Sequence, residues 1–536
     1  MENEVDVGRT TDNEKSFELA LTWIYNCLEN HEYCNRSLPL PENRILPGRL
    51  IDVGDWPNVP PRLCATDGLP LETNYMTLSH CWSSYMPLRL TTSTLENFQD
   101  HLDISALPQT FKDAIKITAT LGIQYLWIDS LCIIQDSEQD WTEQAGLMGD
   151  IYHNSWCNIA ATAARDARDG CFRERNPLAV RKCLVEANWH SHPTQTLSCA
   201  SVDFWDNSIS NTLLHSRAWV VQELVLAPRV LHFGEQLYWE CLEQRASETF
   251  PTSLPSDRRT KTSLNVHSLR HEWNLEKPLK LNRYLLWNLF VKRYSECDLT
   301  KPELDKLVAI SGLARKLIVD GDQYVAGLWR EILPQQLMWS VQDPGTGTEP
   351  GNSYIPSWSW ASMNRRVKMH APSEIAANNP ILIRIISAEI SLLGKDPFGQ
   401  IKAGGVLRLE GPLVKTTIRR CIENNRSNEK WWLGTALAVV KPDRGSFADG
   451  TPVFCLTIED ALSFGSKVGI VLEPTGFLPG QFCRRGRFTV FDVKAETRYV
   501  QKFMDSHQLE LDAEEYEDKL GIDPSSGLPF YRISLV

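Results

Sequence analysis

The sequence predicts an α/β core built on a mostly parallel sheet, then a helical segment and a β-rich C-terminal region. Two observations predict the core. Short runs rich in branched and aromatic residues alternate with amphipathic stretches of helical length. Polar side chains also follow two of these runs, at the end where parallel strands leave a ligand crevice.

The N-terminal half supplies the first elements of this pattern. Residues 15–35 predict a short amphipathic helix that leads into an extended segment, "RILPGRLIDV". "YMTLSHCW" (75–82) predicts a strand that ends in polar residues. Residues 107–123 predict a helix, with Pro108 in its first turn and Gly122 at its end.

The next elements surround "YLWIDSLCIIQDSEQDW" (125–141). Its first part, 125–134, predicts a buried strand, and a helix capped by Asp136 or Ser137 is expected over about 138–153. Further strands are expected at 156–164, 229–234 and 236–241, with a helix at 216–226 ended by Pro228. We therefore expect strands 75–79, 125–130, 156–162 and 229–233 in one largely parallel sheet with helices on both faces.

The remaining chain differs in composition from this core. A polar stretch after the core predicts a linker, and aliphatic runs from about residue 380 predict a separate β-rich region. The predicted parts are an N-terminal helix and extended lead-in (1–70), the α/β core (71–245), a polar linker or loop (246–277), a helical segment (278–365) and a β-rich C-terminal region (366–536).

Charge and hydropathy exclude several classes of protein. The net charge is 55 − 67 = −12, which argues against a general nucleic-acid binder. No stretch of eighteen apolar residues predicts a membrane span, and the acidic start is unlike a signal peptide. The 14 cysteines are accordingly expected to be reduced thiols, and the protein to be cytoplasmic.

One group of residues has the spacing of metal ligands. Cys27, His31 and Cys34 follow one another at intervals of four and three, which places them on one face of a helix. Three such ligands could begin a zinc site, but a structural zinc ion needs four. With the fourth ligand missing, the sequence favours a packed, thiol-rich helix face and no metal.

Polar residues inside the apolar runs indicate a functional crevice. Asp129 and Ser130 interrupt the strand at 125–134, although a buried carboxylate without a partner costs several kcal/mol. Ser79 and His80 stand at the end of the preceding strand. Because parallel strands end at the same edge of a sheet, these side chains are expected to meet there, together with Arg217 and Glu223.

Several sequence blocks resemble the fungal heterokaryon incompatibility (HET) domain family. The matching blocks occur in family order, and "YLWIDSLCIIQDS" is close to a signature. One departure is Ser83, where the family usually has Gly after the Trp of the first block. The blocks are "YMTLSHCW", "LPQTFKDAI", "LGIQYLWIDSLCIIQD", "DW", "IYHNSWCNIAATAA", "DGCF" and "RAWVVQE".

The resemblance implies a cytosolic fungal protein linked to non-self recognition and cell death. HET domains are also similar to Toll/interleukin-1 receptor (TIR) domains, which implies a flavodoxin-like core. Ser216, Trp219, Glu223 and Leu224 resemble the Ser, Trp and Glu motif at the third helix of TIR domains. In catalytic TIR domains this Glu cleaves the nicotinamide–ribose bond of NAD, so the comparison implies NAD as a substrate, with no further cofactor.

The residue chemistry is compatible with that reaction. Cleavage of an N-glycoside passes through an oxocarbenium-like state that a carboxylate stabilises. Trp219 and Glu223 are four residues apart and share a helix face, where an indole holds a flat ring. The predicted catalytic residue is Glu223, and the predicted substrate-binding residues are Ser79, His80, Trp82, Asp129, Ser130, Arg217 and Trp219.

Other interpretations remain open at the level of the sequence. The domain could be a non-enzymatic, self-associating module with an unknown protein partner, or an accessory enzyme of a fungal biosynthetic gene cluster. Glu223 could simply pair with Arg217. Cys132 could be a nucleophile with His80 as base, although an inert packed thiol is the commoner case.

Overall fold

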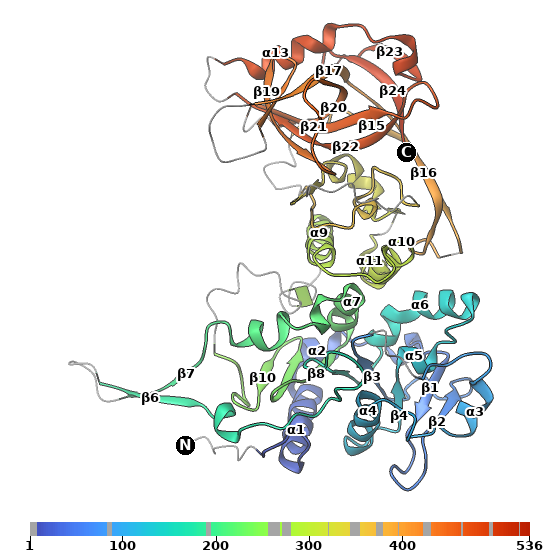
Figure 1. The fold of residues 1–536 in the computed structure, drawn as a ribbon, viewed down its shortest axis with the longest axis vertical. Coiled ribbons are helices and arrows are strands. Elements are labelled where there is room, and N and C mark those ends of the chain that lie inside the picture. The colour runs from blue at the N-terminus through green and yellow to red at the C-terminus, as the bar shows by residue number, and fades with distance from the viewer. Residues whose placement is uncertain are drawn as a thin grey trace. The chain divides into compact units, whose positions relative to one another are not determined.

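The computed structural model divides the chain into two compact units, Met1–Lys277 and Pro278–Val536, each of which is described by itself (Figure 1). Within the described residues, no helix is both long and apolar enough to cross a bilayer. The structure describes residues 8–82, 88–188, 195–255, 269–270, 280–319, 321–343, 354–370, 379–394, 396–421, 430–461, 465–492, 497–524 and 526–536.

Four parallel strands form the centre of the sheet in the first unit. They are β3 (Tyr75–Ser79), β4 (Tyr125–Trp127), β5 (Cys157–Ala160) and β8 (Arg229–Phe233). β3 pairs in parallel with β4 and β5, and β5 pairs in parallel with β8. As the alternation of strands and helices predicts, these four strands share one sheet.

Antiparallel strands extend this sheet at both edges and make it mixed. The added strands are β1 (Arg49–Asp52) and β2 (Arg62–Ala65) on one side, and β9 (Leu237–Cys241) and β10 (Arg245–Ser247) on the other. The order is β10-β9-β8-β5-β3-β4-β1-β2, so the expectation of a mostly parallel sheet is wrong for the sheet as a whole. The three residues between β8 and β9 permit a hairpin, whereas a parallel partner needs a long crossover.

The strand predicted at 125–134 is shorter than expected. β4 ends at Trp127, and Asp129–Cys132 form the short helix α5. The backbone N–H of Cys132 donates to the Ile128 carbonyl, and the N–H of Ile133 donates to that of Asp129. Asp129 and Ser130 therefore lie just after the strand and open a helical turn, which is a correction of the predicted strand.

The helices of the first unit begin and end at recognisable residues. In α4 (Gln109–Thr120), Pro108 is the N-cap, and Gly122 takes a φ of +76° just after the end. The Ser137 side chain accepts a hydrogen bond from the Asp140 N–H at the start of α6 (Glu138–His153). α7 (Ala218–Leu226) ends two residues before Pro228.

The predicted N-terminal helix consists of two helices. α1 (Glu14–Asn30) begins at Asn13, whose side chain accepts from the Ser16 N–H. His31 is extended, with φ of −93° and ψ of 103°, and separates α1 from α2 (Glu32–Arg36). The remaining elements are α3 (Leu95–Asp100), the hairpin β6 (Cys183–Ala187) and β7 (Gln195–Cys199), and the short helical turns Pro41–Asn43, Pro177–Val180, Asp206–Ser210 and Leu214–Ser216.

The second unit begins with helices and short strand pairs. The helices of this first part are α9 (Lys280–Ser295), α10 (Pro302–Asp305), α11 (Ser311–Leu317) and α12 (Leu333–Gln336), with 3-10 turns at Val308–Ile310, Arg330–Ile332 and Trp360–Ser362. Two-stranded pairs join β11 (Tyr324–Val325) to β12 (Leu328–Trp329), and β13 (Ser340–Val341) to β14 (Val367–Lys368).

A β-rich region completes the second unit, as the aliphatic runs predict. β22 pairs with both β19 and β21, so β22-β19-β18-β17-β20-β21 closes into a ring around a core that includes Trp431, Val471 and Phe488. Its elements are β15 (Arg384–Leu392), β16 (Ile401–Gly411), β17 (Leu413–Arg420), β18 (Lys430–Leu433), β19 (Ala436–Pro442), β20 (Thr451–Ala461), β21 (Ser466–Pro474), β22 (Gln481–Val490), β23 (Asp518–Ile522) and β24 (Pro529–Leu535), with α13 (Tyr499–Asp505) and turns at Ser506–Gln508 and Ala513–Glu515.

A buried ion pair attaches α1 to the edge of the first sheet. The Arg175 guanidinium donates to the Glu248 carboxylate, and both side chains are only 2% exposed. Glu248 also accepts from the Ser16 hydroxyl at 2.6 Å and from the Leu237 backbone N–H at 2.8 Å. One carboxylate thereby connects a helix, a strand and a connecting segment.

We expect Glu248→Ala to lower the free energy of unfolding by about 3–5 kcal/mol, because the Arg175 charge then stays buried without its partner. Chemical denaturation of the variant measures the loss. The double variant Arg175→Met, Glu248→Leu is the matched control and should recover most of the stability. Equal stability of Glu248→Ala and the wild type would contradict this role.

Candidate functional site

Two of the polar residues predicted to meet, Ser79 and Asp129, lie at the carboxyl ends of neighbouring parallel strands. Ser79 is the last residue of β3, and Asp129 follows β4 by one residue after Ile128. Glu223 lies in the middle of α7. The Ser79 hydroxyl donates a hydrogen bond of 2.5 Å to Oε2 of Glu223, so residues 144 positions apart in the chain meet directly.

Two further side chains complete the surroundings of Ser79 and Glu223. The amide of Asn158, on β5, donates to the Ser79 Oγ at 3.0 Å, and its Oδ1 accepts from the Thr77 hydroxyl at 2.9 Å. The Tyr152 hydroxyl donates to the Leu78 carbonyl at 3.2 Å and also interacts with Glu223. Sequence reasoning missed both residues, although Asn158 interrupts an apolar strand in the same way as Asp129.

The carboxyl of Glu223 has an unusual affinity for protons. Its side chain is buried, and this burial raises the pKa of Glu223 from 4.5 to about 7. The hydrogen bond from Ser79 opposes the shift, and the charge of Asp129 adds to it. The group therefore changes charge near neutral pH, which is a property often found in functional carboxyls.

Asp129 is hydrogen-bonded through both of its carboxylate oxygens. Oδ2 accepts from the indole N–H of Trp82 at 2.7 Å, and Oδ1 accepts from the backbone N–H of Ser130 at 2.6 Å. Nε2 of His80 lies 3.8 Å from Oδ1, too far for a hydrogen bond. Burial lowers the pKa of His80, although the charge of Asp129 raises it, so the imidazole is neutral at pH 7.

The carboxylate of Asp129 thus has one side-chain and one backbone hydrogen-bond partner and is 21% exposed, unlike a group sealed in an apolar layer. His80 stacks on Trp82 with ring centroids 6.3 Å apart and meets Phe111 edge-on at 5.1 Å. Among the described residues, the Ser130 hydroxyl and Nε2 of His80 are buried without a hydrogen-bond partner.

The remaining predicted residues lie on or beside α7. The guanidinium of Arg217, at the N-cap of this helix, donates to the Trp82 carbonyl at 3.2 Å. Its charge lowers the pKa of Glu223 without being the dominant influence. Trp219 is half-buried on the same helix. Ser83 lies outside the described residues.

A cysteine nucleophile is a poorer fit to this geometry. Cys132 is buried on α5, and its burial raises the pKa of the thiol to about 12. Such a thiol stays protonated at neutral pH and is a weak nucleophile. The packed, inert thiol is the interpretation that these surroundings favour.

Two cavities lie away from this cluster. One is lined by residues that include Lys112, Asp113 and Arg173 of the first unit. The other lies in the second unit, and its lining includes Leu304 and Tyr354. Neither lining includes Ser79, Asp129 or Glu223, so hydrogen bonds and burial define this cluster.

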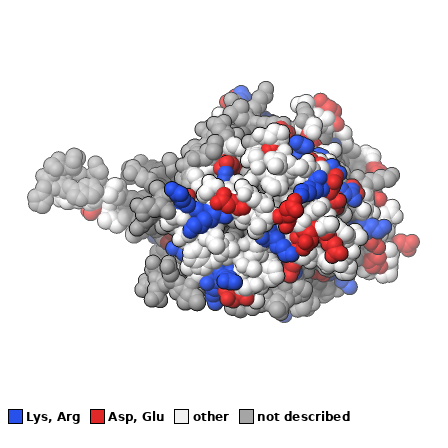
Figure 2. Space-filling model, turned by 90° about the horizontal axis from the view of Figure 1, so that it is seen from above, with Lys and Arg blue, Asp and Glu red and all other residues white. Residues whose placement is uncertain are grey.

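The surface charges are mixed on the face seen in Figure 2, where basic and acidic side chains alternate among the described residues. That face carries no continuous basic field within the part of the chain that is drawn in colour. Nucleic-acid binding generally uses such a field.

The structure adds a fourth residue to the possible metal ligands near the N-terminus. Because α1 ends at Asn30 and His31 is extended, Cys27, His31 and Cys34 do not share one helix face as predicted. Their side chains instead meet Cys241 at the end of β9, and the four ligand atoms all lie within 4.8 Å of one another. The sequence could not identify this fourth ligand, because it is 207 residues beyond Cys34 (241 − 34).

Comparison with known families identifies the region that contains the polar cluster. Residues 75–223 match the family described as heterokaryon incompatibility protein (HET). No curated protein and no solved structure matches the chain. The chain therefore carries a HET domain, whose matched region begins at β3 and ends at Glu223.

The buried carboxyl predicts a specific dependence of stability on pH. Between pH 4.5 and about 7, folded Glu223 keeps a proton that the unfolded chain has released. The contribution of Glu223 to stability therefore decreases as the pH rises through this range and is constant above it.

We expect Glu223→Gln to remove this dependence. Relative to the variant, the wild type should lose up to about 3 kcal/mol between pH 4 and pH 8. Chemical denaturation of both proteins across that range measures the difference. Glu235→Gln, at an exposed position of the same unit, is the control and should follow the wild type. A constant difference between wild type and Glu223→Gln would refute the raised pKa.

Asp129→Asn tests whether Asp129 also has a structural role. An asparagine side chain has only one carbonyl oxygen, so its NH₂ group would face one of the two present donors, Trp82 Nε1–H or the Ser130 N–H. We therefore expect the free energy of unfolding to fall by about 1–3 kcal/mol. Denaturation measures it against Asp67→Asn, at an exposed position. A fully stable variant would show that these two hydrogen bonds do not support the fold.

Proposed function

We propose that this chain is a signalling protein of the heterokaryon incompatibility and cell-death type, which acts in the cytoplasm by cleaving the nicotinamide–ribose bond of NAD. The observation that carries the proposal is the position of Glu223. Its carboxyl lies at the carboxyl ends of parallel strands, bonded to Ser79, and titrates near neutral pH. This edge of an α/β sheet is where ligands commonly bind.

The strand order supports a flavodoxin-like, TIR-like core. Along the sheet the parallel strands run β4-β3-β5-β8, which in chain order is 2-1-3-4. This order is the beginning of the flavodoxin-like arrangement. In that arrangement the order in which strands are added to the sheet reverses between the first and third strands, which here are β3 and β5. These two strands carry Ser79 and Asn158.

The proposed reaction is a hydrolysis at C1′ of the nicotinamide ribose. The C1′–N bond breaks, its electron pair moves to the nicotinamide ring and neutralises the ring charge, and the ribose becomes an oxocarbenium ion. Water then bonds to C1′ and releases a proton, which gives nicotinamide and ADP-ribose. The ionised Glu223 carboxylate stabilises the cation, as in glycoside hydrolysis.

Neighbouring residues would bind the substrate. Arg217 carries a positive charge suited to phosphate groups, and Trp219 and Trp82 offer flat surfaces for a ring. The Ser130 hydroxyl and His80 Nε2, which have no hydrogen-bond partner among the described residues, offer polar contacts. Asp129 orients Trp82 and Ser130 through its two hydrogen bonds.

A non-enzymatic, self-associating module is the second candidate. The observation that favours it is that Glu223 is only 6% exposed and already hydrogen-bonded to Ser79. On this alternative the cluster holds α7 against β3 and β5, and signalling depends on contacts between copies or with a partner protein.

Incubation of the purified full chain with NAD, with nicotinamide release as the readout, separates these candidates. We expect release by the wild type and a loss of about 10²–10³-fold in rate for Glu223→Gln, because the charge that stabilises the cation is gone. Activity should rise with pH through about 7 as Glu223 ionises.

Glu235→Gln is the control at an exposed site and should keep the wild-type rate. Absence of nicotinamide release from folded wild-type protein that still causes cell death would overturn the enzymatic proposal and favour the self-associating module. Equal rates for wild type and Glu223→Gln would overturn the role of Glu223.

A further inference from the structure

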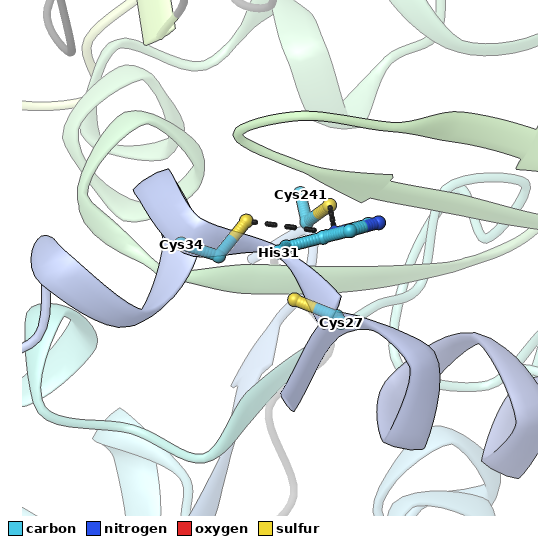
Figure 3. A group of neighbouring side chains, drawn as sticks. All are labelled: Cys27, His31, Cys34 and Cys241. Atoms are coloured by element: carbon cyan, nitrogen blue, oxygen red, sulfur yellow. Dashed lines mark hydrogen bonds between the residues drawn. The ribbon is translucent and has the colours of Figure 1, made fainter. Parts of the chain in front are cut away.

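Four potential metal ligands converge at the edge of the first sheet, away from the polar cluster of the HET domain. The sulfur atoms of Cys27, Cys34 and Cys241 surround the imidazole of His31 (Figure 3). All four ligand atoms lie within 4.8 Å of one another. The three cysteines are buried and His31 is half-buried.

The local fold explains how four residues from distant parts of the chain meet. Cys27 lies in the last turn of α1, and the extended backbone of His31 turns the chain into α2, which carries Cys34. Cys241 ends β9, in the tight connection to β10. Trp23 of α1 stacks on Trp239 of β9, with ring centroids 6.3 Å apart, and holds the two elements together.

The imidazole is oriented with Nδ1 toward the thiols. Nδ1 of His31 lies 3.3 Å from the Cys241 Sγ and 3.8 Å from the Cys34 Sγ. The side-chain amide of Asn26 lies 3.2 Å from Nε2 on the opposite side of the ring. A second partner of this kind, which fixes the ring through its other nitrogen, is usual for metal-binding histidines.

We propose that Cys27, His31, Cys34 and Cys241 hold a structural zinc ion in a Cys₃His site. Three sulfur ligands and one imidazole are a common donor set for structural zinc, and calcium and magnesium prefer oxygen. In a zinc tetrahedron with Zn–S bonds of about 2.3 Å and a Zn–N bond of about 2.0 Å, the ligand atoms are separated by about 3.5–3.8 Å. The two distances from Nδ1 of His31, 3.3 and 3.8 Å, are close to this range.

The electrostatics around the cluster agree with a bound zinc ion. Three thiolates and one Zn²⁺ ion leave a net charge of −1 with a neutral imidazole. Arg229 is 1% exposed and lies within electrostatic range of Cys27, and two of its guanidinium nitrogens have no hydrogen-bond partner among the described residues. The anionic site would compensate this buried cation.

Hydrogen bonds around the ligands also support a bound metal ion. The backbone N–H of Gln244 donates to the Cys241 Sγ at 3.3 Å. The Glu243 carboxylate accepts from the backbone N–H groups of Tyr33 and Cys34, which fixes the start of α2 beside the hairpin. A bound ion would therefore fasten α1 and α2 to the sheet and contribute directly to folding.

The test is the zinc content of the full chain, purified with a thiol reductant and freed of loosely bound metal. Mass spectrometry of the elements should find one zinc ion per wild-type chain. Cys34→Ala and Cys241→Ala should lose the bound zinc, whereas Cys171→Ala should keep it. Cys171 is the matched control, because its thiol is equally buried in the same unit but lies outside the cluster.

Cobalt substitution of the wild-type chain tests the site without a variant that could fail to fold, and one variant then tests the coordination by His31. Co²⁺ added to the metal-free wild type should give the intense visible absorption of a tetrahedral ion and a thiolate charge-transfer band. His31→Cys should keep one metal ion, because four thiolates also bind zinc, and should shift the cobalt spectrum.

Three outcomes would overturn the proposal. One is a folded wild type with neither stoichiometric zinc nor a tetrahedral cobalt spectrum. Another is equal zinc content in Cys241→Ala and the wild type. The third is a disulfide between two of these cysteines in protein isolated without reductant.

Discussion

The hydrogen bond between Ser79 and Glu223 is the interaction on which the architecture of the HET region depends. It joins the end of the central strand β3 to the middle of α7, across 144 residues of sequence. A buried carboxyl is tolerated only where such partners compensate its desolvation. Asn158 and Tyr152 extend this compensation to β5 and α6, so the hydrogen-bonded cluster links two parallel strands with two helices.

The same burial gives the cluster its chemical character. Glu223 keeps its proton up to about pH 7, while Asp129, nearer to solvent, is held by the Trp82 indole and the Ser130 N–H. Two carboxyls in different surroundings thus lie at one edge of the sheet, one buried and one partly exposed. The second unit, with its closed ring of strands, contains none of the residues in this cluster.

Much of the first unit could be predicted from sequence because its signals are local. The alternation of apolar runs and amphipathic stretches in the sequence predicted β3, β4, β5 and β8. The polar residues at the ends of two of these runs pointed to Ser79 and Asp129. The antiparallel edge strands were not predicted, because the general α/β pattern suggests parallel strands. A short connection such as that between β8 and β9 instead forces the two strands to be antiparallel.

The errors in the site have a similar physical origin. The strand at 125–134 ended early because Asp129 begins a helical turn, which an apolar run with aromatic residues does not reveal. Asn158 and Tyr152 were missed because their partners are distant in sequence. Cys241 was missed for the same reason. It ends β9, and the hairpin formed by β8 and β9 places it beside the N-terminal helices.

Infrared titration tests most directly whether Glu223 is a buried carboxyl that exchanges its proton near neutral pH. The carbonyl band of a protonated carboxyl, isolated by subtracting the spectrum of Glu223→Gln, reports this single group. We expect this band to disappear as the pH rises through about 7. Disappearance near pH 4.5, the ordinary pKa of a glutamate, would contradict it.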